Sequence, residues 1–196
     1  MAIVEVRSIR IIAGMYRGRR IVMEDKLAIR PTSDKARGAV FSSLGELVPD
    51  ARFLDVFAGT GAMGIEAISR GAKLVVAVEQ SPRAAALIAR NRDSLGIARE
   101  TLSVCVGSYD KVLPRLFGQQ FDIIFADPPY GDLLGAQVLA LVDGNRLLAP
   151  GGVLIIEHFA KESLPTDAGG LTLHKEKDYG QTVMSHYLWA GGNRRD

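Results

Sequence analysis

The sequence has very little cysteine, because Cys105 is the only one among 196 residues. An internal disulfide needs two cysteines, so a disulfide-stabilised fold and a cysteine-based metal site are both excluded. The three histidines, His158, His174 and His186, do not have the spacing of a metal-binding motif, and we predict structural or surface roles for them. No metal is therefore expected.

Long hydrophobic runs are also missing. No segment approaches the 18 consecutive apolar residues of a membrane-spanning helix, and charges at Glu5, Arg7 and Arg10 stand where a signal peptide would be apolar. We therefore expect a cytoplasmic, monomeric protein with no membrane partner. A hydrophobic content of 47% in a chain of this length predicts one well-packed domain with a small appendage.

Positive and negative charges nearly balance, with a net charge of only +2, but they are unevenly distributed along the chain. Residues 1–37 contain nine Lys or Arg residues against four acids, a net of +5, which leaves −3 for the remainder. A basic amino-terminal part on a slightly acidic body predicts contact with a polyanion. On charge alone, a solvated basic surface is the alternative.

Hydrophobic patterning predicts a small hairpin ahead of the main domain. Residues 9–23 form two short apolar segments joined through Gly14 to Gly18, with basic residues at the turn. An extended lead-in around Pro31 follows, and helical spacing of apolar residues predicts a helix over 34–46. We place the extension at residues 1–30 and the main domain at 31–196.

From residue 52 onward, strand-like and helix-like segments alternate, which is typical of a parallel sheet covered by helices. Strands are predicted near 53–57, 73–79, 101–106, 121–126 and 152–157, and helices near 62–70, 82–95, 109–117 and 132–142. Segments 171–177 and 182–189 predict a terminal antiparallel hairpin. The fold class is therefore α/β, Rossmann-like, with a mostly parallel sheet.

The first predicted strand of this domain runs into a glycine loop. Gly59, Gly61 and Gly64 fit the G-x-G-x-x-G pattern, in which a ligand approaches the backbone closely. About 20 residues further on, Glu79 ends the next strand, where its carboxylate can accept hydrogen bonds from ribose hydroxyls. The combination predicts a nucleoside site.

Asp55 discriminates between two ligands for such a site. An acid inside the strand that leads into the loop would repel the pyrophosphate of a nicotinamide dinucleotide. It suits S-adenosylmethionine, which carries an ammonium and a sulfonium cation. We therefore favour the methyl donor.

A second motif, Asp127-Pro128-Pro129-Tyr130, directly follows the apolar strand near 121–126. The prolines have no N–H to donate and fix φ, so the turn is stiff. It can present a carboxylate, backbone acceptors and an aromatic face to a planar group that carries an amine. An ordinary turn is the alternative for this tetrapeptide taken alone.

With Asp55-x-Phe57-x-Gly59-x-Gly61, Glu79 and the Asp-Pro-Pro-Tyr motif in this order, the chain resembles class I S-adenosylmethionine-dependent methyltransferases that act on exocyclic amines. More narrowly, it resembles the bacterial RsmD family, the 16S ribosomal RNA guanine-N2 methyltransferases. The resemblance covers nearly the whole chain. Its further motifs are Arg10-Ile11-Ile12-Ala13-Gly14, Arg17-Gly18-Arg19, Arg30-Pro31-Thr32-x-Asp34, Glu66-Ala67, Ser69-Arg70-Gly71-Ala72 and Tyr179-Gly180-Gln181-Thr182.

The resemblance implies roles for particular residues and a ribosomal RNA partner, in the form of an assembled small subunit. The implied cofactor-binding residues are Asp55, Phe57, Gly59, Thr60, Gly61, Glu79, Gln80, Ser108 and Asp127. The implied catalytic residues are Asp127, Pro128, Pro129 and Tyr130. The implied substrate-binding residues are Arg10, Arg17, Arg19, Arg20, Arg30, Thr32, Lys35 and Arg37.

Two positions depart from the family pattern. Gly38 stands where an acidic residue usually follows the helix arginine, Arg37. Ser108 follows Gly107 where an aspartate commonly contacts adenine, so adenine binding would rest on Ser108, Tyr109 or backbone groups.

Other functions stay open at this point. They are an adenine-N6 nucleic acid methyltransferase, a protein-glutamine methyltransferase and a non-catalytic nucleotide-binding module. Glutamine methyltransferases of similar architecture carry Asn where Asp127 stands, and a binding module would have no need for Asp127.

Overall fold

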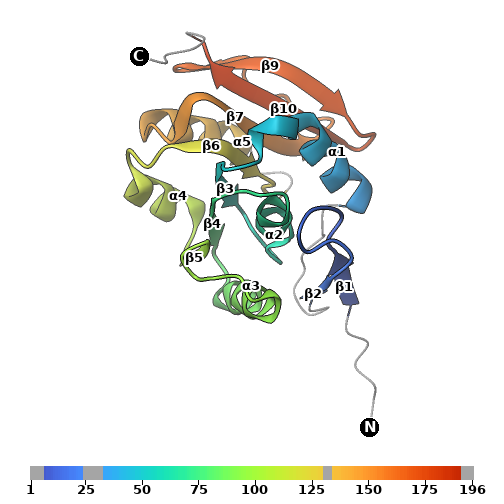
Figure 1. Ribbon diagram of the computed structural model, residues 1–196. Helices are drawn as coiled ribbons and strands as arrows, with labels where there is room; N and C mark the ends of the chain where they lie inside the picture. Colours follow the sequence, from blue (N-terminus) through green and yellow to red (C-terminus); the bar gives the residue numbers. More distant parts are fainter. Residues whose placement is uncertain (1–6, 24–32, 130–133, 191–196) are drawn as a thin grey trace.

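The computed structural model describes residues 7–23, 33–129 and 134–190 (Figure 1). A two-stranded ribbon comes first, formed by β1 (Arg7–Arg10) and β2 (Arg20–Met23). An eight-stranded sheet follows, in the order β5-β4-β3-β6-β7-β10-β9-β8. Its strands are β3 (Arg52–Val56), β4 (Leu74–Glu79), β5 (Leu102–Val106), β6 (Phe121–Ala126), β7 (Leu148–Phe159), β8 (Asp167–Ala168), β9 (Leu171–Asp178) and β10 (Thr182–Trp189).

The helices lie between these strands along the chain. They are α1 (Asp34–Leu44), α2 (Ala62–Ser69), α3 (Pro82–Leu95), α4 (Tyr109–Val112) and α5 (Leu134–Gly144), with two short 3-10 turns, η1 (Gly45–Leu47) and η2 (Leu113–Leu116). None of the helices in the described ranges has both the length and the apolarity needed to cross a membrane.

The sheet has the predicted mixed topology. Strands β3 to β7 are parallel, whereas β10 pairs antiparallel with both β7 and β9. The chain builds outward from β3 through β4 to β5, and then returns to place β6 on the other side of β3. In open α/β sheets, the carboxyl ends of the strands at such a reversal form the usual ligand crevice. The α/β fold and the terminal hairpin predicted from the sequence are confirmed.

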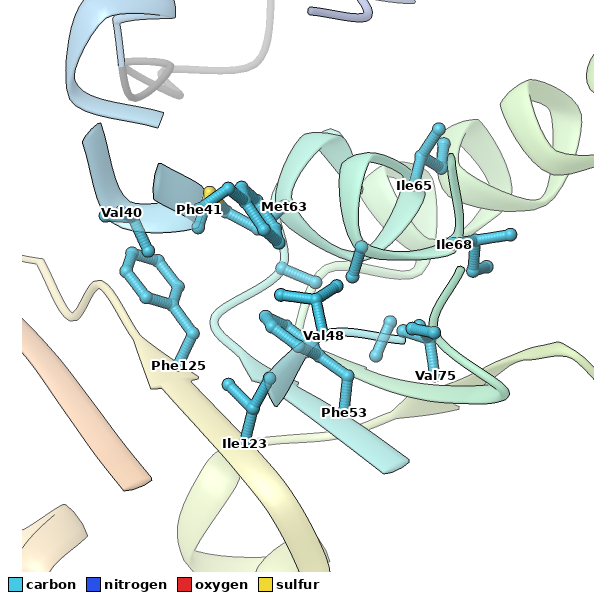
Figure 2. Packing of buried hydrophobic residues seen from close by; sticks show 14 of the residues in the cluster. Val40, Phe41, Val48, Phe53, Met63, Ile65, Ile68, Val75, Ile123 and Phe125 are labelled. Carbon is cyan, nitrogen blue, oxygen red and sulfur yellow. The ribbon is translucent and has the colours of Figure 1, made fainter. Parts of the chain in front are cut away.

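Two apolar clusters cover the two faces of the sheet. On one face, Phe53, Ile123 and Phe125 meet side chains from α1 and α2, among them Phe41 and Met63 (Figure 2). On the other face, β-strand residues pack against α4, η2 and α5. Burial on both faces explains why the central strands are nearly continuous apolar runs.

Three predicted elements differ in detail. The helix expected over 109–117 is divided into α4 and η2, because Pro114 has no N–H to continue the α-helical pattern. Helix α1 ends at Leu44, where Gly45 has a positive φ of 49°. The amino-terminal strands are shorter than expected, and residues 11–19 form a long connecting loop instead of extended strands.

The predicted boundary between an extension and a catalytic domain at residue 30 stays a prediction. In Figure 1 the β1–β2 ribbon lies beside α2 and α3. Ile9, Ile11 and Ile21 are buried in the same cluster as residues of the main domain. We call residues 7–23 the basic hairpin.

Candidate active site

Residues of the glycine loop and of the Asp-Pro-Pro-Tyr motif lie at the carboxyl ends of the parallel strands. Val56 of β3 has Val78 of β4 as its register partner on one side and Ala126 of β6 on the other. The segments that leave these strands are 57–61, 79–81 and 127–129, and 107–108 follows β5 next to β4. The glycine loop and the Asp-Pro-Pro turn therefore adjoin at the reversal point of the sheet.

Glu79 holds the glycine loop in place. Its Oε2 accepts a hydrogen bond from the N–H of Gly59 at 2.8 Å, and its Oε1 accepts one from the N–H of Ser81 at 2.8 Å. The Ser81 hydroxyl in turn caps α3 through the N–H of Ala84. A carboxylate oxygen has more than one lone-pair site, so Glu79 can still accept hydrogen bonds from the hydroxyls of a ribose.

The backbone of the loop is constrained at two positions. Phe57 has φ = 68°, which is rare for a bulky residue, and its ring contacts that of Tyr109 with 5.1 Å between centroids. Gly61, at the start of α2, has φ = 78°, and a Cβ there would lie 2.9 Å from Cγ2 of Ile88. A strained position such as Phe57 is typical of ligand sites.

Asp55 lies beneath the loop and is only 2% exposed. Its Oδ2 accepts a hydrogen bond from the N–H of Gly64 at 3.0 Å, which ties β3 to α2. Burial raises the pKa of Asp55 to about 7, while the Gly64 N–H opposes the shift and the charge of Glu79 adds to it. A cation bound nearby would favour the charged form of this carboxyl group.

The other predicted cofactor residues differ in exposure. Thr60 is buried, whereas Gln80 is exposed directly after Glu79. Ser108 has intermediate burial and immediately precedes α4. A hydrogen bond from Ser108 is the main cause of the lowered pKa of Asp110.

Asp127 and its two prolines follow β6. Asp127 has intermediate burial, Pro128 is buried and Pro129 is exposed, whereas Tyr130 lies outside the described residues. Ala126 pairs with Ile156 of β7, so Asp127, the first residue after β6, and Glu157, near the end of β7, each directly follow this pair. Glu157 is 6% exposed. Sequence reasoning missed it, although the acid at the end of the predicted strand 152–157 was a possible signal.

Several predicted substrate residues lie on the basic hairpin. Arg10, Arg17, Arg19 and Arg20 are exposed, as is Lys35 on α1, while Arg30 and Thr32 lie outside the described residues. Arg10 and Arg20 are directly opposite each other across β1 and β2. Like charges in this position repel each other, and a bound anion would relieve the repulsion.

A cleft of about 390 Å³ lies next to this arginine pair, between the ribbon and the start of α1. Its lining includes Ser8, Arg10, Arg20, Met23, Ser33 and Asp34. The Nε of Arg20 donates a hydrogen bond to the Ser8 hydroxyl at 2.7 Å, which holds its guanidinium on the outer surface of the ribbon.

Two of the residues predicted to contact phosphates, Arg37 and Arg19, have hydrogen-bond partners within the protein. Arg37 is 1% exposed, and its guanidinium donates to the carbonyl oxygen of Arg10 at 2.6 Å and to Asp34 at 2.9 Å. This burial is at odds with a phosphate contact by Arg37. Arg19 donates to the carbonyl oxygen of Ser94 at 2.8 Å and lies over the ring of Tyr16.

Sequence comparison with known proteins identifies the family of this chain. Residues 9–188 match the family described as conserved hypothetical protein 95. Ribosomal RNA small subunit methyltransferase D of Escherichia coli is 33% identical over 91% of this chain and 89% of its own. The protein of the same name from Haemophilus influenzae is 33% identical over 92% and 93%. The chain belongs to the RsmD family.

A solved structure agrees with this assignment. The E. coli structure described as a candidate methyltransferase, yhhF, has a TM-score of 0.84 and 32% identity, and the match covers 93% of this chain and 98% of that one. The resemblance inferred from the motifs is therefore confirmed.

The RsmD motifs outside the active site prove to contact one another. Glu66 of α2, only 1% exposed, accepts hydrogen bonds from the N–H groups of Ile12 and Ala13 at 2.9 and 3.1 Å. It also forms a 2.8 Å ion pair with Arg70. Its carboxylate thus fastens the hairpin loop to α2, a role that sequence reasoning missed although Glu66 was part of a motif.

Ser69, at the end of α2, completes this attachment. Its hydroxyl accepts from the N–H of Tyr16 at 3.0 Å and donates to the carbonyl oxygen of Ala13 at 2.5 Å. Its own carbonyl oxygen accepts from the N–H of Met15 at 2.6 Å.

Across the described parts of the chain, no group of three or more His, Cys, Asp or Glu residues could hold a metal ion.

Proposed function

We propose that this protein transfers a methyl group from S-adenosylmethionine to the exocyclic N2 amine of a guanine in 16S ribosomal RNA. The observation that carries the proposal is the position of Asp127, at the end of β6 and next to the glycine loop that leaves β3. Membership of the RsmD family and the names of its E. coli and H. influenzae relatives support the reaction and the RNA substrate.

The cofactor would lie across the carboxyl ends of β3, β4 and β5. Glu79 would accept hydrogen bonds from the ribose hydroxyls, and the constrained loop at 57–61 would let the ligand approach the backbone. Asp55 would balance the positive charge of the methionine part. The adenine would lie towards Ser108 and Tyr109, since β5 ends beside β4.

Catalysis would depend chiefly on placement. The guanine amine is a poor nucleophile because its lone pair is delocalised, while a sulfonium methyl group is a strong electrophile. Holding the two in line is worth ~7–11 kcal/mol in ideal cases. Asp127 and a carbonyl of the proline turn would accept the two amine hydrogens and direct the lone pair towards the methyl carbon.

The methyl transfer would need no reactant other than S-adenosylmethionine and the guanine. The nitrogen–methyl bond forms as the sulfur–methyl bond breaks, which leaves S-adenosylhomocysteine. The nitrogen becomes positively charged and then loses one proton to Asp127 or to solvent. Tyr130 would stack on the base, which must leave its own stack at a cost of a few kcal/mol.

Two adjacent acids support guanine over adenine. Guanine carries hydrogens on both N1 and N2, so its edge offers donors side by side, whereas adenine has an acceptor at N1. Asp127 could accept from N2–H and Glu157, its neighbour on β7, from N1–H. A carboxylate beside the unprotonated N1 of adenine would be repelled.

The cellular setting follows from the same proposal. The substrate would be an assembled small ribosomal subunit in the cytoplasm, and the enzyme would act as a monomer. The exposed arginines of the basic hairpin would hold RNA phosphates, which gives position but little base specificity.

The experiment that tests the proposed function is methylation of small subunits from a strain lacking this protein, followed by analysis of the modified nucleosides. We expect N2-methylguanosine. Asp127→Ala should abolish transfer while S-adenosylhomocysteine affinity stays within a few fold, and Glu157→Gln should lower kcat/KM by at least ~10-fold, the cost of about 1.4 kcal/mol in the transition state.

Asp122→Ala is a matched control, because Asp122 lies at the opposite end of β6, where it accepts a hydrogen bond from the N–H of Arg52. It should keep most of the activity. N6-methyladenosine as the product, or near-normal turnover in Asp127→Ala, would contradict the proposed function.

A further inference from the structure

Asn91 joins two parts of the molecule that the proposed function assigns to different ligands. It is a residue of α3 and is only 2% exposed. Its Oδ1 accepts from the N–H of Val22 at 2.9 Å, and its Nδ2 donates to the carbonyl oxygen of Val22 at 3.0 Å. The side chain therefore pairs with the backbone of β2 in the manner of a neighbouring strand.

The same amide nitrogen also reaches the glycine loop. Nδ2 of Asn91 donates to the carbonyl oxygen of Thr60 at 3.2 Å. Thr60 is 3% exposed and directly precedes Gly61, the N-cap residue of α2. One side chain thus bridges the basic hairpin and the predicted cofactor loop.

The surroundings make this bridge stiff. One turn earlier on α3, Ile88 lies so near the loop that a Cβ on Gly61 would be 2.9 Å from its Cγ2. Asn91 donates through its amide nitrogen to two carbonyl oxygens, and a buried amide that loses a partner is destabilising. A shift of β2 therefore has to move Asn91, break its hydrogen bond to Thr60, or leave a buried group without a partner.

We propose that Asn91 is a positioning residue that couples RNA binding at the basic hairpin to the conformation of the cofactor loop. The inference rests on the proposed function, because it assigns RNA to the hairpin and S-adenosylmethionine to the loop. Coupling between two sites is reciprocal, so RNA must change cofactor affinity by the same factor as cofactor changes RNA affinity.

The test measures that factor with S-adenosylhomocysteine and small ribosomal subunits lacking the modification. In the wild type we expect each ligand to change the affinity of the other by ~5-fold or more, at the lower end of typical coupling. Asn91→Asp keeps the shape and the acceptor for the Val22 N–H, but it removes the donor to the carbonyl oxygens of both Thr60 and Val22. In this variant, and in Asn91→Ala, the factor should fall to within 2-fold of one.

Ser69→Ala is the matched control. It removes the hydrogen bonds to Tyr16 and Ala13 and so weakens attachment of the same hairpin, but these side-chain hydrogen bonds of Ser69 do not involve the cofactor loop at 57–61. Its RNA affinity should fall while the coupling factor is retained. Loss of the factor in Ser69→Ala as well would show that only hairpin attachment matters and would overturn the inference.

A measurement on the wild type avoids any dependence on the folding of the variants. Amide hydrogen exchange at residues 59–61 should slow when RNA binds without cofactor, and exchange unchanged by RNA would also overturn the inference. A wild type that binds neither ligand would instead contradict the proposed function. A coupling factor of one in a wild type that binds both would contradict the role of Asn91 alone.

Discussion

At the scale of single residues, Asp55 is an acid that the fold removes from water. It is buried against α2, and its hydrogen bond from Gly64 does not offset the loss of hydration, so its pKa rises to about 7. The folded protein then binds a proton more tightly than the unfolded chain. Stability from this group is present at pH values below 3.8 and is lost as the pH rises through about 7.

We expect Asp55→Asn to stabilise the ligand-free protein at pH 8, by at most on the order of 4 kcal/mol, because the variant has no buried charge to form. The gain should shrink as the pH falls towards 4. Denaturant unfolding at several pH values measures this difference. The same variant should bind S-adenosylhomocysteine more weakly, because it lacks a charge to balance the ligand ammonium.

Asp122→Asn is the control for this series, since Asp122 has intermediate burial at the far end of β6. Stability curves for Asp55→Asn and the wild type that run parallel from pH 4 to 8 would show that Asp55 is ionised in the folded protein throughout.

At the scale of elements, attachment of the basic hairpin to α2 depends on a close backbone approach. Gly14 has φ = 81°, and a Cβ there would overlap the carbonyl group of Ser69, which also accepts from the N–H of Met15. Gly18, in the same loop, has nearly the same φ of 83° but nothing within 4 Å of its Cβ position. Comparing substitutions at the two glycines therefore distinguishes the effect of steric contact from that of backbone strain.

We expect Gly18→Ala to cost ~1–2 kcal/mol, the strain of a left-handed residue. Gly14→Ala should cost clearly more and weaken RNA binding, because the hairpin loop must leave α2. Denaturant midpoints and RNA affinities of the two variants provide the comparison. Equal losses in both would mean that the close approach at Ser69 contributes nothing to stability.

At the scale of the whole molecule, the basic hairpin carries most of the charge asymmetry. Arg10, Arg17 and Arg20 are exposed, and two of them face each other across the ribbon, whereas Arg37 is used internally. RNA binding that releases counterions weakens as salt rises, with a slope set by the number of phosphates contacted.

We expect the triple change of Arg10, Arg17 and Arg20 to Gln to weaken RNA binding and to reduce the slope of log affinity against log salt by about 2–3. S-adenosylhomocysteine affinity measured without RNA should stay unchanged. The control is a triple change of the exposed residues Lys73, Arg99 and Arg115 to Gln, which lowers the net charge by the same three units. Similar slopes for the two triple variants would place the RNA surface elsewhere.

Features that depend on local order and spacing could be predicted from the sequence. The alternation of apolar strands and helices predicted the α/β sheet, and Gly59, Gly61 and Glu79 were linked by their spacing because a strand, a tight loop and a helix must follow one another. Asp127 was identified for the same reason, since two prolines end a strand wherever it lies in the fold.

Only the tertiary structure decided which distant segments meet. The sequence counts Arg37 among the basic residues, but its burial follows from the approach of Asp34, Glu66 and the backbone of Arg10. The contacts of Asn91 with residues 69 and 31 positions away are equally invisible in a linear pattern. Periodicity reports which face of an element is apolar, whereas the partner of a buried polar group is set by how the elements pack.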